Sequence, residues 1–342
     1  MMRLVRDWRI GWGLVLSIVV SAGVVSAEDV SLEPPAVRAL LARALPLLQK
    51  SAATYIAKRD CFSCHHQALP AIAVATLKRA GHSVDTESAA DQSDFTEAYF
   101  GGRGKRVRVG EGVPGGAYNA GYALWSLHAE GRKPNGVTND LVAYLRTKHR
   151  RDGSWRIRTH RPPLEDSHFT ATALSLKGLQ LYAGQSGAKD LAERTGRTRA
   201  WLIRAKPKTN EDRVFRLLGV AWAGGADKKV KEYARDLGTR QRDDGGWSQL
   251  DDGSSDAYAT GQALYALRQS GLAISDDRFQ QGCRYLVKTA KPDGSWHVVT
   301  RSKAIQKYFE TDFPHEKSQF ISICGTCWAV LSLAELLPST PN

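Results

Sequence analysis

The segment Gln241–Trp247 has the sequence QRDDGGW, and shorter versions of it occur at two other places in the chain. These versions are RDGSW at Arg151–Trp155 and PDGSW at Pro292–Trp296. A stretch with helical periodicity precedes each copy, and an apolar stretch rich in small residues follows it after a loop. A turn that recurs in this setting indicates a protein built from helical hairpins.

The second helices of these hairpins align without gaps over their first turns. One apolar position anchors the alignment in six places, at Ala73, Ala123, Ala173, Leu217, Ala263 and Ala329. Successive anchors are 50, 50, 44, 46 and 66 residues apart. Before the three motif copies, the first helices are predicted over 141–149, 230–241 and 279–289. Six hairpins account for nearly all of the chain after its amino-terminal segment.

Six hairpins are few for an open stack, and neither end of the array carries a polar repeat that would cover an exposed apolar face. Small residues dominate the second helices, which suits an inner wall where helices approach closely, whereas Lys and Arg crowd the first helices. The sequence therefore predicts an all-α fold, an (α/α)6 toroid with inner and outer helix rings, formed by residues 28–342 as one domain.

The repeated turn resembles that of the terpenoid cyclase and protein prenyltransferase superfamily, whose repeats carry a Q-x-x-D-G-x-W turn. The copy at Gln241–Trp247 is the fullest, and the resemblance covers residues 34–336. It implies the squalene-cyclase-like toroid fold and an apolar or isoprenoid-like ligand. It does not imply one reaction, because this fold hosts cyclases, prenyltransferases, lyases and binding domains.

The reactive sites of that superfamily are not intact in this chain. The D-x-D-D acid of squalene–hopene type cyclases aligns with the sequence DAYA at Asp256–Ala259, which keeps only Asp256. The zinc ligands of protein prenyltransferases align with Asp256, Tyr258 and approximately Gly325, so two of three ligands are missing. Whether the protein is an enzyme therefore stays open.

The amino-terminal 27 residues have the features of a secretory signal. Arg3, Arg6 and Arg9 precede an apolar run over 11–25, and a small-x-small site ends at Ala27. The expected location is secreted or periplasmic, with an uncleaved membrane anchor as the alternative. The formal charge of +13 favours anionic partners such as a membrane surface. A nucleic-acid partner is not expected.

The sequence CFSCH at residues 61–65 matches the attachment signature of c-type haem. In that signature the thiols of Cys61 and Cys64 bond to the haem vinyl groups, and His65 binds the iron. Three alternatives are a Cys61–Cys64 disulfide, a thiol–disulfide exchange site, and zinc held by Cys61, Cys64 and His66. A second CxxC pair, Cys324 and Cys327, fits buried thiols or a disulfide.

The second axial ligand of such a haem cannot be methionine, because the chain has only Met1 and Met2 and the signal segment contains both. His66 or His168 is the candidate, and an open position is the alternative. Without the Met–His pair that raises cytochrome c potentials, a low potential or a reactive iron is expected.

Fixed offsets from the six anchors place several polar residues at the heads of the inner helices. These helices run parallel, so their heads should gather at one mouth of the toroid, beside the segment 61–65. The candidate catalytic residues are Asp166, His168, Asp256 and Tyr258. For the two aspartates, helix capping is the competing interpretation, since Asp is a favoured N-cap residue.

Two functions follow from these features. The first is an exported toroid with covalently bound haem c, for electron transfer with a redox partner or for redox chemistry on an apolar ligand in the central cavity. The alternative is a haem-free ligand-binding or lyase- or cyclase-type protein that uses the polar ring at the mouth. Cys61 and Cys64 would then form a disulfide or a metal site.

Overall fold

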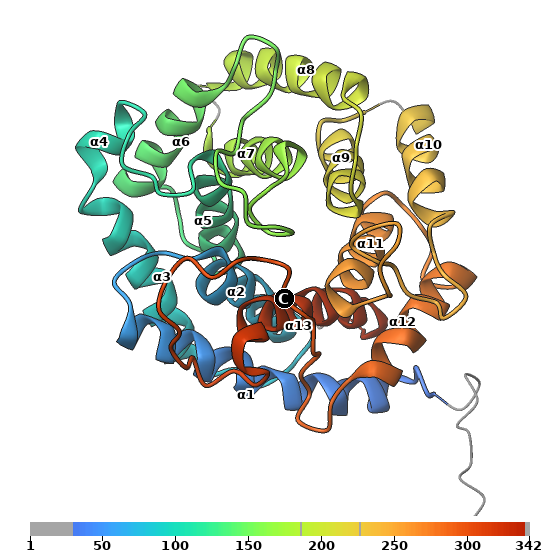
Figure 1. Ribbon diagram of the computed structural model, residues 1–342. Coiled ribbons are helices and arrows are strands. Elements are labelled where there is room, and N and C mark those ends of the chain that lie inside the picture. Colours follow the sequence, from blue (N-terminus) through green and yellow to red (C-terminus); the bar gives the residue numbers. More distant parts are fainter. Residues whose placement is uncertain (1–29, 185–186, 226, 339–342) are drawn as a thin grey trace, which may run out of the picture. The chain divides into compact units, whose positions relative to one another are not determined.

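Helices of this protein alternate between an outer and an inner ring, as Figure 1 shows for the computed structural model. The structure describes residues 30–184, 187–225 and 227–338, so the predicted signal segment 1–27 lies outside the described residues. The outer ring consists of α1 (Pro34–Lys58), α3 (Thr86–Gly101), the short α4 (Gly104–Arg108), α6 (Gly136–Lys148), α8 (Ala188–Arg204), α10 (Asp227–Gly238) and α12 (Asp277–Thr289). The inner ring consists of α2 (Leu69–Arg79), α5 (Ala117–Ala129), α7 (His168–Tyr182), α9 (Asn210–Trp222), α11 (Ala257–Gln269) and α13 (Gln319–Leu333).

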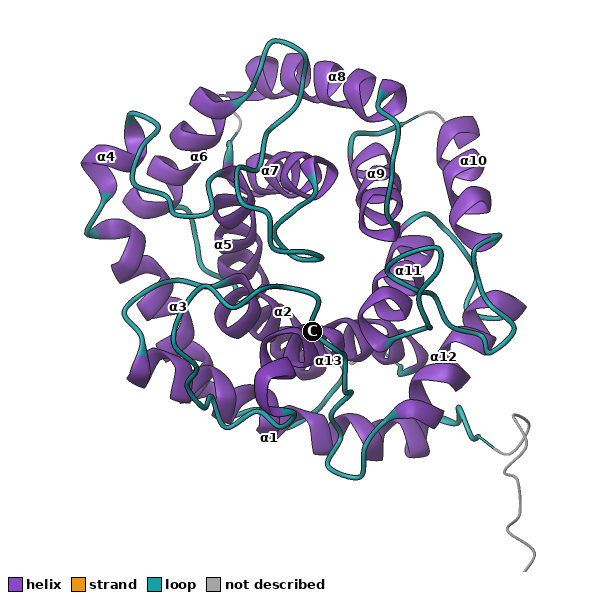
Figure 2. Ribbon diagram, viewed as in Figure 1, coloured by secondary structure: helices purple, strands orange, loops and turns teal. Residues whose placement is uncertain are grey.

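The inner ring is closed. Each inner helix packs against the next one along the chain, and the last, α13, packs against both α2 and α1. Figure 2 shows helices and loops only, and no β-strand occurs among the described residues. The predicted all-α toroid of six hairpins is therefore confirmed.

Small residues bring the inner helices together, as the composition predicts. All six anchor positions lie within inner helices and are fully buried. A Cβ atom added at Gly121 would lie 2.7 Å from the Leu174 backbone, and one at Gly261 would lie 2.5 Å from the Trp328 backbone. Only glycine permits such contacts, because any side chain would overlap the neighbouring helix.

The three D-G-x-W turns connect α6 to α7, α10 to α11 and α12 to α13. The indole N–H of each motif tryptophan donates to a backbone carbonyl oxygen near the end of the preceding outer helix, at 2.7 to 2.9 Å. These pairs are Trp155 with Leu145, Trp247 with Leu237, and Trp296 with Leu286. The backbone N–H of the same tryptophans donates to threonine hydroxyls on the next inner helix, namely Thr172, Thr260 and Thr326. The motif therefore fixes the relative position of the two helices.

Aromatic side chains fill the centre of the ring. Trp125 on α5 lies 6.1 Å from Tyr265 on α11 and 6.3 Å from Trp328 on α13, measured between ring centroids. Because α5 and α11 stand opposite one another, these contacts cross the axis of the ring. The described interior is thus divided into one cavity at the amino ends of the inner helices and another at their carboxyl ends.

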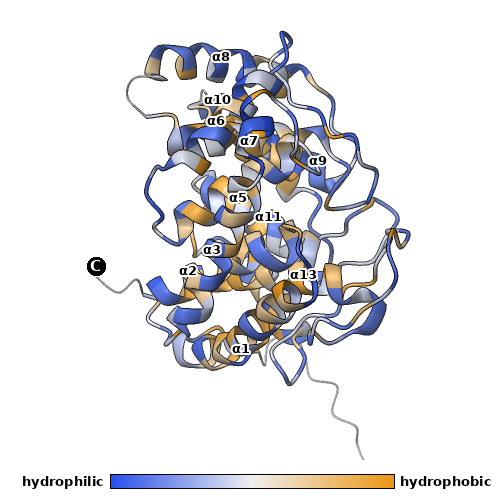
Figure 3. Ribbon diagram, turned by 90° about the vertical axis from the view of Figure 1, so that its left-hand side faces the viewer, coloured by the Kyte–Doolittle hydropathy of each residue, from blue (hydrophilic) through white to orange (hydrophobic). Residues whose placement is uncertain are grey.

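One helical stretch, Glu316–Leu336, is long and apolar enough to cross a membrane by length and composition. Its most apolar window is 83% buried within the structure. It contains α13, and Figure 3 shows how hydrophobic this inner helix is compared with the outer helix α8. Its composition is therefore that of a core helix.

Ring closure can be tested at Gly294, in the last motif turn, which has φ of +86°. A Cβ atom there would lie 2.5 Å from the backbone nitrogen of Ala44 on α1. Gly294→Ala should lower the free energy of unfolding by well over the ~1–2 kcal/mol that a positive φ alone costs alanine. Urea unfolding, followed by circular dichroism, measures this change.

Gly271 provides the matched control, because it has φ of +95° and no atom within 4 Å of an added Cβ. Gly271→Ala should therefore lower the free energy of unfolding only by the ~1–2 kcal/mol that a positive φ costs alanine. Equal losses in the two variants would contradict the tight contact between the last turn and α1.

Candidate functional site

The segment that carries Cys61, Cys64 and His65 lies immediately before the first inner helix. Cys64–Ala68 forms a short π-helical turn that continues into α2. The hydroxyl of Ser63 accepts a hydrogen bond from the His66 backbone N–H at 3.1 Å. Gln67 Oε1 accepts from both the backbone N–H and the hydroxyl of Ser63, at 2.7 Å each. These contacts fix the backbone of the segment in one conformation.

The two thiols of the segment are unbonded and differ in access. Cys61 is partly exposed, and its Sγ lies 3.4 Å from the hydroxyl of Tyr55. Cys64 is buried, and burial raises the pKa of its thiol to about 12. Cys324 and Cys327 are also unbonded and fully buried, so they are buried thiols in this structure.

His65 lines a cavity of about 320 Å³. The apolar part of its wall comes from Pro162, Pro163, Leu164, Ile305, Phe320 and Ile321. Four cationic side chains also line it, namely Arg161, Lys303, Lys307 and Lys317. Ile305 and Tyr308 are 66% and 42% exposed, so the cavity presents uncovered hydrophobic surface.

His65 and His66 contact each other through their Nδ1 atoms. Burial, with Arg161 nearby, lowers the pKa of His65 to about 3, and burial lowers the pKa of His66 well below its ordinary value. Both rings are therefore neutral, the form in which imidazole binds a metal. Tyr55 stacks on His66 with ring centroids 5.0 Å apart. His66 therefore supports the orientation of His65 from one side.

The residues around His65 fit a haem group in part. The ring of His65 makes its contact with His66 through Nδ1, and Nε2 of His66 is buried without a hydrogen-bond partner in the described structure. No group of three or more His, Cys, Asp or Glu side chains in the described ranges is arranged to hold a metal ion. His65 is also the single described histidine that lines this cavity, and His168 lines a different one.

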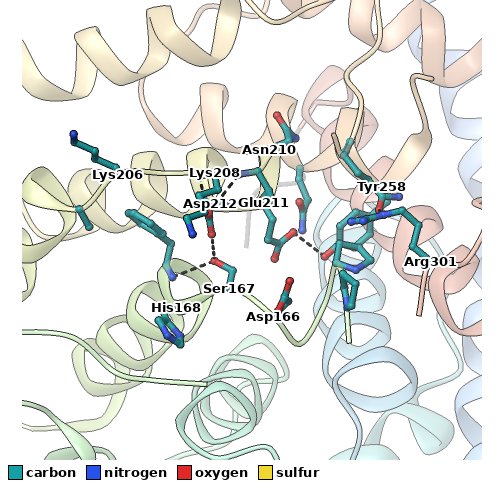
Figure 4. Close-up of a pocket in the computed structure, with 18 of the residues that line it drawn as sticks. Asp166, Ser167, His168, Lys206, Lys208, Asn210, Glu211, Asp212, Tyr258 and Arg301 are labelled. Atoms are coloured by element: carbon teal, nitrogen blue, oxygen red, sulfur yellow. Dashed lines mark hydrogen bonds between the residues drawn. The ribbon is translucent and has the colours of Figure 1, made fainter. Parts of the chain in front are cut away.

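A second cavity, of about 520 Å³, lies at the amino ends of α7, α9 and α11 (Figure 4). Three of the four predicted catalytic residues line it, namely Asp166, His168 and Tyr258. Asp256 is absent from its lining, and its carboxylate accepts a hydrogen bond from the Ala259 backbone N–H at 3.0 Å. The capping interpretation of Asp256 is therefore confirmed, and burial raises its pKa to about 6.

Asp166 is not the cap of α7. Ser167 holds that position, and its hydroxyl accepts from the backbone N–H groups of Phe169 and Thr170 at 3.1 and 3.2 Å. Asp166 instead contacts Nδ1 of His160. The capping interpretation of Asp166 is wrong because the serine one residue later supplies the cap.

The sequence analysis missed Glu211, the most deeply placed acid of this cavity. Its carboxyl group accepts hydrogen bonds from the hydroxyls of Thr170 at 2.8 Å and Tyr258 at 3.0 Å. Figure 4 shows Glu211 reaching from the head of α9 toward Tyr258 on α11. Burial raises the pKa of Glu211 to about 8, although both hydroxyls act to lower it. The carboxyl group is therefore protonated at neutral pH.

The proton on Glu211 should make stability depend on pH. Its pKa in the folded state is above its ordinary value of 4.5, so the folded protein keeps a proton that the unfolded chain releases. Its contribution to stability is therefore present at low pH and is lost as the pH rises toward 8. The loss is at most about 1.4 kcal/mol per pH unit.

Glu211→Gln keeps a neutral side chain of the same size. The stability of this variant should therefore not fall in this way as the pH rises toward 8. We expect the two proteins to unfold at similar urea concentrations near pH 5 and the variant to be the more stable near pH 8. A constant difference between them across this range would contradict a protonated Glu211.

The thiols should differ in reactivity, because modification requires access to the sulfur. In the folded, haem-free protein, a maleimide should modify Cys61 and leave Cys64, Cys283, Cys324 and Cys327 intact. In denaturant it should modify all five. Peptide mass spectrometry reports the sites, and Cys61→Ser should abolish labelling of the folded protein. Equal labelling of Cys61 and Cys64 would contradict the burial of Cys64.

Comparison with known proteins identifies the fold. No family model and no curated protein matches this chain. One similar solved structure is a variant of the type II terpene cyclase MstE from Scytonema in complex with geranylgeranyl dihydroxybenzoate. It is 16% identical to this chain with a TM-score of 0.55, and the match covers 88% of this chain and 99% of the cyclase. A glycosidase in complex with glucose is 13% identical with a TM-score of 0.55, over 87% and 97% of the two chains.

A third similar structure is ent-copalyl diphosphate synthase from Streptomyces platensis, at 19% identity and a TM-score of 0.52 over 79% of this chain. The match covers only 51% of that synthase. At these identities, the similarity concerns the fold alone. The chain thus has the α/α toroid fold that type II terpene cyclases and a glycosidase also have.

Proposed function

We propose that this protein is an exported redox protein that carries haem c, attached through Cys61 and Cys64 with His65 as an axial ligand. One observation carries the proposal: His65, which completes the haem-attachment motif, lines a cavity with apolar walls and four cationic side chains. When bound, haem would supply a one-electron couple at its iron.

The protein's own residues support this assignment in three ways. Phe320 packs against His65 with ring centroids 5.2 Å apart, and the cavity's apolar wall suits a macrocycle. The three lysines would pair with the propionate groups, whereas Arg161 already forms an ion pair with Glu165 on the same cavity wall. The neutral imidazole of His65, held by His66 through Nδ1, would bind iron through Nε2.

Cys64 constrains when the haem could be attached. Its thiol is buried, so it cannot reach a haem vinyl group in the folded structure. Attachment would therefore precede the completion of the fold, or require the segment 61–68 to open. His66 and His168 stay predictions as second axial ligands, and the cavity lining offers no further described histidine.

Electron transfer is the better-supported role within this proposal. In this role the haem itself would occupy the cavity beside His65, and no substrate has to share it. An isoprenoid-like ligand would instead occupy the cavity of about 590 Å³ at the carboxyl ends of the inner helices, which Trp125 and Tyr265 line. The exposed lysines beside His65 would attract an anionic redox partner or membrane surface.

The test is a reduced pyridine haemochrome spectrum of the whole protein, expressed with export and cytochrome c maturation machinery. We expect the α band of haem with two thioether bonds, and its loss in the Cys61→Ala/Cys64→Ala double variant. His65→Ala should alter the spectrum of the native ferric protein while leaving the pyridine haemochrome unchanged.

Cys283→Ala is the matched control, because Cys283 is a buried thiol on the outer helix α12, outside the motif. It should keep the full spectrum. Haem added to the folded, haem-free protein should not attach. A colourless, folded and helical product from the maturation host would overturn the proposal.

A further inference from the structure

The polar cavity at the amino ends of α7, α9 and α11 contains buried polar atoms that the described structure leaves without partners. Gln262 is 1% exposed, and the Glu211 carboxyl group is a hydrogen-bonding neighbour of its amide, although the contact falls short of full hydrogen-bond geometry. Nδ2 of Asn210, which lines the same cavity, also lacks a partner. Buried polar groups are nearly always paired in native proteins, so this cavity is shaped for an occupant.

The inner end of the cavity is suited to hydroxyl groups. The amides of Gln262 and Asn210 each offer a donor and an acceptor, and the neutral carboxyl group of Glu211 offers both as well. A hydroxyl group also donates and accepts, so several hydroxyls on one ligand match this set. A phosphate or a metal ion would leave most of these atoms unpaired.

Two aromatic rings form part of the wall. Phe169 and Trp201 line the cavity, and their ring centroids are 4.9 Å apart. Such rings pack against the C–H face of a sugar ring while its hydroxyls reach the polar groups.

The rim of the cavity has a surplus of positive charge. Four exposed cationic residues line it, namely Arg156, Lys206, Lys208 and Arg301. Of the two carboxylates on the same wall, Asp212 accepts from the Ser167 hydroxyl at 2.6 Å and from the Lys208 backbone at 2.8 Å. Asp166 is paired with His160. Arg156 is paired with Asp152 at 3.3 Å, and the two carboxylates keep their charges, so Lys206, Lys208 and Arg301 leave a small positive surplus at the rim. This surplus favours a ligand with an anionic group at its outer end.

We propose that this cavity binds an acidic saccharide, with its hydroxyls on Asn210, Glu211 and Gln262 and its carboxylate toward Arg301 and the basic rim. The volume of about 520 Å³ is in the range of small-molecule sites. Polar side chains from Asn210, Glu211 and Gln262 line its inner end, which suits hydroxyl groups better than an isoprenoid chain. This site is independent of whether haem is attached at Cys61 and Cys64.

Isothermal titration calorimetry of the whole protein tests the proposal with three probes: trigalacturonate, the neutral trisaccharide maltotriose, and geranylgeranyl diphosphate. Trigalacturonate should bind, and maltotriose should bind at least tenfold more weakly. Arg301→Gln should reduce this preference for the acidic probe. Gln262→Leu should weaken trigalacturonate binding at least tenfold.

Gln92→Leu is the matched control, because Gln92 on the outer helix α3 is also buried with both amide atoms unpaired. It should leave the affinity unchanged, and circular dichroism should show all variants folded. The absence of trigalacturonate binding at millimolar concentration would overturn the proposal. An affinity that Gln262→Leu leaves unchanged, or tighter binding of the isoprenyl diphosphate, would overturn it too.

Discussion

The hydrogen bond from a motif tryptophan to the end of the preceding outer helix is the interaction on which the ring depends. The last carbonyl groups of a helix have no partner within it, and burying them unpaired is costly. In three hairpins, the indole N–H donates to one of these groups, and in two of them a backbone N–H donates to the same carbonyl oxygen; the tryptophan backbone binds a threonine of the next inner helix. The turn thereby determines both the distance and the angle between successive hairpins.

Two of the three hairpins that lack this turn carry unusual chemistry. In the first, the segment with Cys61, Cys64 and His65 replaces the turn, and Ser63 and Gln67 fix its backbone. In the fourth, Thr209 and Asp212 form a capping box at the head of α9, and Glu211 lies between them. Without a motif tryptophan, the amino ends of α2 and α9 place imidazole and carboxyl groups at the same mouth of the ring.

The fold could be predicted from the sequence because its repeat is local. A turn motif in three hairpins, four spacings of 44 to 50 residues and an apolar anchor in all six define the repeat, and all six anchors are buried as expected. The site could be predicted only in part. The predicted residues Asp166 and His168 lie seven and five residues before their anchor, Ala173. The same offsets from Leu217 fall on Asn210 and Asp212 and pass over Glu211, which lies six residues before Leu217. The sequence TNED at 209–212 has the spacing of a capping box, which would have assigned Asp212 to capping and left Glu211 as the unexplained acid.

Two cavities with different chemistry share one wall. Pro162 and Pro163 line both the cavity beside His65 and the polar cavity beside Glu211. The loop before α13 is anchored to this wall, because the hydroxyl of Ser302 donates to the carbonyl oxygen of Pro162 at 3.0 Å. That loop also supplies Arg301 to the polar cavity, and Ile305 and Tyr308 to the other. The largest departure from the repeat spacing, 66 residues, therefore has a structural reason: the extra residues build the partition between the two cavities.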